Sequence, residues 1–127
     1  SGPTARCSCS RRSPEDDAPG GNPMLYLIYG VDGPDAGRIR ASTRDAHFAY
    51  LERHRDILVL GGATLADDGV ARTGSVLIVN VASRAEADAF AQDEPFRKAG
   101  LFARHTVTRM RRGQWNPDAA PRTAEGS

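Results

Sequence analysis

The chain has 127 residues, of which 39% are hydrophobic and 26% charged, a composition typical of one globular domain and too apolar for a wholly disordered chain. Its formal net charge is +1, so no strong field favours nucleic acid or an anionic membrane as a partner. The longest apolar runs, residues 24–29 and 57–60, are far shorter than the roughly 18 residues of a membrane-spanning helix. No secretory signal is visible, and Cys7 and Cys9 stand too close together for a disulfide-built fold. We therefore expect a cytoplasmic enzyme or binding protein.

Composition divides the chain into three parts. Residues 1–23 contain only Cys and Ala as apolar residues, so they cannot bury enough surface to offset the entropy of ordering. We expect this segment to be a disordered N-terminal extension. The abrupt apolar run at Met24 opens a folded domain that we place at residues 24–115. Residues 116–127 are polar again and are expected to form a flexible C-terminal tail.

The first half of this domain predicts a strand followed by a helix. Residues 24–29 are continuously apolar and end at Gly30, which is typical of a strand buried on both faces. The segment Ser42–Arg55 has helical periodicity, with Phe48 and Leu51 on one stripe. Ser42 is expected to cap the N-terminus of this helix.

The second half predicts two strands, a helix and a last strand. Residues 57–60 form a short apolar strand, and residues 75–81 are rich in β-branched side chains. The sequence Asp-Asp-Gly at 67–69 supplies a turn between them. Ser83 and Glu86 have the spacing of a capping box, which opens a helix to about Gln92. Residues 101–110 alternate weakly, as in a strand.

The resulting order, β-α-β-β-α-β, predicts a ferredoxin-like α+β fold, in which a four-stranded antiparallel sheet carries two helices on one face. Two helices leave the other face of the sheet uncovered. We expect a homodimer to cover it.

Three histidines are candidates for chemistry. His47 and His54 lie on the predicted first helix about 10 Å apart along its axis, which is too far for one metal ion, and no metal site is predicted. We interpret His54 as a histidine that stabilises the helix C-terminus and His105 as a structural side chain on the last strand. His47 lies among aromatic and aliphatic residues, and its helical spacing alone leaves a structural and a catalytic role open.

Asp93 and Glu94 precede Pro95, which disfavours helical geometry at Glu94 and ends the second helix. They form either an acidic surface turn or a carboxylate that fixes the tautomer of an imidazole. Gly61 and Gly62 lack the remaining features of a phosphate loop, and we interpret them as a bulge or close backbone approach that gives a ligand room.

An ordered set of motifs resembles the YciI-like (YCII-related domain) family. It covers nearly all of residues 24–110 and consists of the run at 24–29, Arg44 and His47 with Tyr50-Leu51, Leu60-Gly61-Gly62, Thr73-Gly74-Ser75 and residues 94–101. The resemblance implies a dimeric ferredoxin-like α+β barrel. It also implies a catalytic dyad between His47 and the carboxylate before the Pro-aromatic pair. The family has Asp there, whereas this chain has Glu94 with Asp93 one residue earlier, so either carboxylate is a candidate.

The resemblance implies a function of the isomerase or lyase type. We predict a cofactor-independent enzyme that moves a proton on a small cyclic or aromatic carbonyl compound, with His47 as the base and Glu94 or Asp93 as its partner. Substrate binding is assigned to Arg44, Gly61, Gly62 and Ser75. One alternative is a non-catalytic small-molecule-binding or assembly protein. Another is a cofactor-free monooxygenase or cyclase that acts on a polyketide-like aromatic.

Overall fold

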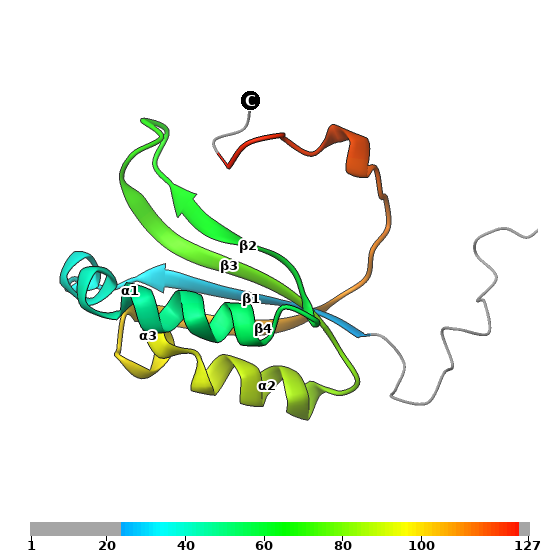
Figure 1. Cartoon of the computed structure of the whole chain (residues 1–127), viewed down its shortest axis with the longest axis horizontal. Helices are drawn as coiled ribbons and strands as arrows, with labels where there is room; N and C mark the ends of the chain where they lie inside the picture. Colours follow the sequence, from blue (N-terminus) through cyan, green and yellow to red (C-terminus); the bar gives the residue numbers. More distant parts are fainter. Residues whose placement is uncertain (1–23, 125–127) are drawn as a thin grey trace, which may run out of the picture.

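A single antiparallel sheet organises the protein (Figure 1). The computed structural model describes residues 24–124. Its strands are β1 (Met24–Asp32), β2 (Leu58–Leu65), β3 (Arg72–Val81) and β4 (Phe102–Met110), arranged in the order β2-β3-β1-β4. The two central strands, β3 and β1, pair with each other, with Ile28 opposite Leu77.

The helices lie together on one side of this sheet (Figure 1). They are α1 (Ala36–Arg53), α2 (Arg84–Asp93) and the short α3 (Pro95–Lys98). A single 3-10 turn, η2 (Pro117–Ala119), follows the last strand and buries no residue. Together with the strand order, this arrangement confirms the predicted ferredoxin-like α+β fold.

The core lies between the helices and the sheet and forms two clusters. The larger one joins alternate residues of β1 and β3, such as Ile28 and Val79, to Tyr50 of α1 and Phe90 of α2. The smaller cluster lies at the start of α1 and consists of Ala36, Ile39, Phe96 and Leu101, with Phe102 packed against it. This second cluster connects α1 to α3 and thereby sets the position of the helix that carries His47.

The first strand differs from its prediction in two ways. It continues through Gly30 to Asp32. The absence of a side chain at Gly30 lets the ring of Phe102 on β4 pack against the strand, where a Cβ would collide with that ring. It is also not buried on both faces. The burial of its residues alternates, and Tyr29 remains 37% exposed on the face without helices.

The first helix starts six residues earlier than predicted, and Ser42 is not its cap. Asp35 occupies the N-cap position without a side-chain hydrogen bond, and the Ser42 hydroxyl instead donates to the carbonyl of Ile39 within the helix. The first turns lack an apolar stripe of their own. They form because Ala36 and Ile39 pack in the second cluster against Phe96 and Leu101, about 60 residues later in the sequence.

The predicted capping box and turn are confirmed, and strand β2 is longer than predicted. The Ser83 side chain accepts a hydrogen bond from the Glu86 N–H, as the capping box predicts, and α2 ends before Glu94. Asp68 accepts hydrogen bonds from two backbone N–H groups in the predicted turn, where Gly69 has a φ of 74°. Strand β2 runs through Gly61 and Gly62 to Leu65, so the predicted strand at 57–60 was too short.

Two sequence predictions remain untested in the structure. Residues 1–23, with Cys7 and Cys9, lie outside the described residues, and so does the end of the predicted C-terminal tail. Among residues 24–124, no helix is long and apolar enough to cross a membrane.

Candidate active site

His47 and Glu94 form a buried pair between α1 and the junction of α2 with α3. The Nδ1 atom of His47 lies 2.5 Å from Oε2 of Glu94. Only 7% of His47 and 3% of Glu94 is exposed. An acidic surface turn, one of the two interpretations of this segment, is therefore wrong for Glu94. Asp93 is exposed, and the structure places Glu94 rather than Asp93 against the imidazole.

The backbone at the junction explains why Glu94 points inward. Pro95 favours extended geometry in the residue before it, and Glu94 has φ −68° and ψ 130°. This conformation ends α2 and makes Glu94 the N-cap of α3, where Oε2 also accepts a hydrogen bond of 3.0 Å from the Phe96 N–H. The backbone thus holds the Glu94 carboxylate in place independently of its contact with His47.

A stacked ring holds the imidazole of His47, and a hydrogen bond holds the helix that carries it. The ring of Phe96 stacks on the imidazole, with centroids 3.9 Å apart and planes inclined by 13°. One turn later in α1, the Tyr50 hydroxyl donates to the carbonyl of Phe90 and ties the helix to α2. Burial is the largest cause that raises the pKa of Tyr50 to about 12, so the hydroxyl keeps its proton as a donor.

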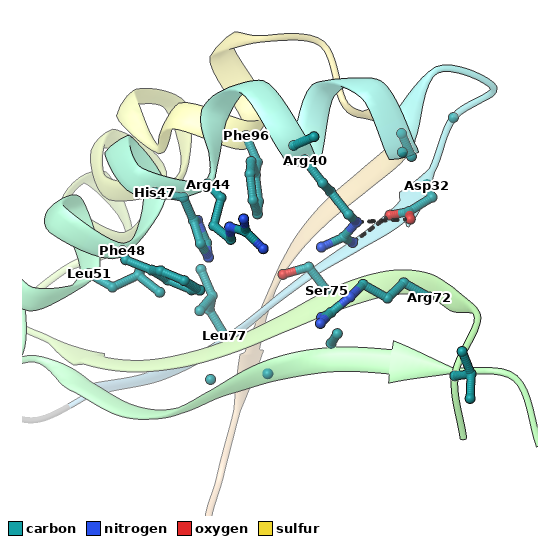
Figure 2. Close-up of a pocket in the computed structure, with 18 of the residues that line it drawn as sticks. Asp32, Arg40, Arg44, His47, Phe48, Leu51, Arg72, Ser75, Leu77 and Phe96 are labelled. Carbon is teal, nitrogen blue, oxygen red and sulfur yellow. Dashed lines mark hydrogen bonds and ion pairs between the residues drawn. The ribbon is translucent and has the colours of Figure 1, made fainter. Parts of the chain in front are cut away.

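This geometry selects one tautomer. A carboxylate accepts a hydrogen bond and does not donate one, so Nδ1 of His47 carries the proton that Glu94 accepts. In the neutral ring, Nε2 is then the acceptor. Figure 2 shows the ring edge of His47 directed into a pocket, which leaves Nε2 available to a ligand.

The pocket has a cavity volume of about 660 Å³ and lies between α1 and the strands β2 and β3. That volume is in the range of small-molecule binding sites. All four predicted substrate-binding residues line it: Arg44, Gly61, Gly62 and Ser75. Ser75 is 9% exposed, and Figure 2 shows its hydroxyl pointing into the pocket.

Gly61 and Gly62 differ in what surrounds them. A Cβ at Gly61 would lie 2.9 Å from Cδ2 of Leu77 on the pocket floor, whereas a Cβ at Gly62 would meet nothing within 4 Å. The register irregularities of β2 fall at Leu58–Leu60 and Thr64–Leu65, not at the glycines. Gly61 is therefore a close approach, one of the two predicted interpretations, whereas the glycines themselves do not form a bulge.

Several pocket residues were missed by the sequence reasoning. Arg40 of α1 donates to the Asp32 carboxylate at 2.8 and 3.2 Å and to the carbonyl of Gly74. Phe96 and Arg72 also line the pocket. The Pro-aromatic pair signalled Phe96, but no local pattern separates Arg40 or Arg72 from arginines on the surface.

The other two histidines lie away from this pocket. Nδ1 of His54 contacts the carbonyl of Tyr50 at 2.9 Å at the C-terminal end of α1, in line with its predicted role. His105 faces the helices, and its Nδ1 accepts a hydrogen bond of 2.7 Å from Arg97. No group of three or more His, Cys, Asp and Glu side chains within the described part of the chain could hold a metal ion.

The fold is that of a small ferredoxin-like α+β domain with a buried histidine–carboxylate pair beside a pocket. The YCII-related domain model matches residues 24–111, and the chain belongs to this family. The predicted family resemblance is therefore confirmed.

The known proteins that resemble the chain include one enzyme. Protein YciI from Escherichia coli and from Shigella flexneri is 35% identical over 91 residues, which is 66% of this chain and 93% of each relative. The 5-chloro-2-hydroxyhydroquinone dehydrochlorinase from Burkholderia phenoliruptrix, solved in complex with 2,5-dihydroxybenzoquinone, is 41% identical with a TM-score of 0.62. The match covers 69% of this chain and 94% of the dehydrochlorinase.

Proposed function

We propose that the protein is a cofactor-independent isomerase or lyase in which His47, oriented by Glu94, moves a proton on a small cyclic or aromatic carbonyl compound. The contact between His47 Nδ1 and Glu94 Oε2, at the edge of a pocket of about 660 Å³, carries this proposal. An imidazole held in one tautomer beside a cavity is the arrangement that general base catalysis needs.

The chemistry begins at Nε2 of His47. This atom takes a proton from the carbon next to the carbonyl group, and the electron pair of the broken C–H bond forms an enolate. The enolate then takes a proton at another carbon, which completes an isomerisation, or expels a leaving group, which completes an elimination. Glu94 stabilises the imidazolium in the interval, and the Ser75 hydroxyl donates to the enolate oxygen.

The 41% identical dehydrochlorinase supports the elimination branch and the aromatic substrate class. The quinone bound in that structure has the six-membered ring and the carbonyl groups that this mechanism uses. The apolar lining residues Phe48, Leu51 and Leu77 offer surfaces on which such a ring can pack.

The test uses two reactions, one that reports loss of a leaving group and one that reports proton transfer. One is chloride release from 5-chloro-2-hydroxyhydroquinone, and the other is exchange of the ring hydrogens of 2,5-dihydroxybenzoquinone in D₂O, followed by NMR. We expect the wild-type protein to accelerate at least one reaction and His47→Gln to lower kcat by about a hundredfold or more.

His54→Gln is the matched control, because His54 lies in the segment that ends α1 but does not line the pocket. This variant should keep wild-type turnover. A wild-type protein that binds the quinone but accelerates neither reaction would contradict the proposal and favour a non-catalytic binding protein.

A further inference from the structure

The pocket is polarised along the axis of α1 (Figure 2). Phe48 and Leu51 lie at one end with His47, and Arg40 lies at the other, about two turns or 10 Å before His47 in the helix. Arg44 occupies the middle of this wall. A ligand that fills the pocket therefore meets apolar surface near the imidazole and arginine side chains further along the helix.

Three arginines and a single aspartate line this pocket, so its charge is unbalanced. Arg40 is already neutralised, since its guanidinium binds both oxygens of Asp32 and the carbonyl of Gly74. Within residues 24–124, the side chains of Arg44 and Arg72 have no hydrogen bond, ion pair or cation–π contact.

The two unpaired arginines come from opposite walls. Arg44 lies on α1, one turn before His47, and Arg72 lies at the start of β3, three residues before Ser75. Figure 2 shows both guanidinium groups directed into the space between the helix and the strands. Ser75, whose buried hydroxyl also has no hydrogen-bond partner in the described chain, lies on the same wall as Arg72.

We propose that Arg44 and Arg72 bind a carboxylate group of the substrate, so that the ligand is a ring acid held with its acidic group away from His47. A guanidinium binds a carboxylate through two parallel hydrogen bonds, and Arg44 and Arg72 are both exposed at the pocket, so their charges can be reached by a ligand. The inference rests on the proposed function, since it names the substrate class of the same site.

The size and shape of the pocket agree with this class. A single six-membered ring can lie against Phe48 and Leu77, with its reacting carbon near Nε2 of His47. A carboxylate on the far side of the ring then reaches the zone between the two arginines. Of the two arginines, Arg72 is the better one to replace, because it lies on β3 and not on the helix that carries His47. We assign the preference for an acid to this residue.

The experiment compares two probes that differ only in charge, 2,5-dihydroxybenzoate and its neutral analogue 2,5-dihydroxybenzamide. Their dissociation constants are measured by calorimetry at constant salt. The acid should bind the wild-type protein at least about tenfold more tightly than the amide. Arg72→Gln should weaken binding of the acid by about tenfold and binding of the amide by less than about twofold.

Arg38→Gln is the matched control. It removes the same charge from α1, but its side chain is 72% exposed and lies outside the pocket. This variant should bind both probes as the wild-type protein does. Arg72→Lys should restore part of the preference for the acid, since it returns the charge without the forked geometry.

Three outcomes would overturn the inference: equal affinity for acid and amide, equal losses for both probes in Arg72→Gln, and no binding of the acid at millimolar concentration. The proposed function is tested by turnover and can therefore fail independently of this inference. Because the preference for the acid comes from Arg44 and Arg72, His47→Gln should keep that preference while it loses turnover. Turnover of the uncharged hydroquinone together with equal affinities would uphold the function and reject the substrate class.

Discussion

Glu94 makes two contacts through one carboxylate oxygen, with His47 Nδ1 and with the Phe96 N–H. The backbone contact fixes the carboxyl group in place, and the contact with His47 then fixes the imidazole. The hydrogen bond from the Phe96 N–H needs only an acceptor oxygen, whereas the stabilisation of imidazolium needs a negative charge. The two roles of Glu94 can therefore be separated by mutation.

Glu94→Gln keeps an acceptor oxygen but removes the charge, so we expect a loss of about tenfold in kcat with the fold intact. The loss should be smaller than that of His47→Gln, because the imidazole itself remains. Asp93→Asn is the control and should change kcat by less than about twofold, since Asp93 is exposed. A larger loss in Asp93→Asn than in Glu94→Gln would assign the partner to Asp93. Steady-state kinetics on the reactions above measure both variants.

His105 has a pKa lowered by burial, and the positive charge of Arg97 lowers the pKa further, while Glu94 acts in the opposite direction. The unfolded chain therefore binds a proton at this residue more readily than the folded chain does. Protonation of His105 favours unfolding, so its effect is absent above the unfolded pKa of about 6.5 and grows as the pH falls below it.

We expect the free energy of unfolding of the wild-type protein to fall between pH 8 and pH 5 by more than that of His105→Gln. Urea titrations of both proteins at the two pH values measure the difference, and the other titrating groups are common to both. An identical pH dependence in the two proteins would show that His105 does not contribute.

At the scale of elements, the pocket lies between α1 and the sheet, and β2 lines it with two glycines. A Cβ at Gly61 would displace Leu77, which lines the pocket, while a Cβ at Gly62 would enter open space. These neighbouring residues share the backbone propensity of glycine and differ mainly in what they face.

Gly61→Ala should therefore weaken binding of 2,5-dihydroxybenzoquinone about threefold to tenfold, because the methyl group pushes Leu77 toward the ligand. Gly62→Ala should leave the dissociation constant within about twofold of the wild-type value. Calorimetric titration compares the two variants under the same conditions. If both weaken binding equally, the effect comes from the strand backbone and not from the pocket floor.

At the scale of the whole molecule, the sheet is covered by helices on one face (Figure 1). The residues of β1 and β3 that alternate with the core face the other side, where Leu27 pairs with Ile78 and Tyr29 with Val76. These side chains are partly or largely exposed in the single chain. An apolar sheet face of this kind is typical of a surface that another protein covers.

We expect a homodimer that buries this face, with an interface above roughly 1,000 Å². Multi-angle light scattering at micromolar concentration should return twice the mass of one chain. Ile78→Lys should shift the mass toward the monomer, since it places a charge at the centre of the face. Ala89→Lys, at an exposed position of α2, should remain dimeric. A monomeric wild-type protein would refute the expectation.

Much of the fold was predicted from local patterns. The capping box at Ser83 and the turn at 67–69 appear where they were expected, because both are made by contacts between residues that are neighbours in the sequence. The order of strands and helices was also correct. The errors depend on contacts between distant residues: β1 is buried on one face only, α3 was not predicted, and α1 starts at Ala36 because it packs against α3.

The candidate site divides in the same way. The sequence by itself singled out His47 and the acidic pair before Pro95, and the restriction that proline imposes on Glu94 is a local effect. Only the tertiary structure decided that Glu94 meets an imidazole 47 residues away, that Asp93 stays outside, and that Arg72 shares a pocket with Arg44. Periodicity and caps report on neighbours in the chain, whereas a site depends on how a helix and a sheet pack against each other. That packing is the sum of many weak contacts between distant residues, so no short segment of the sequence carries it.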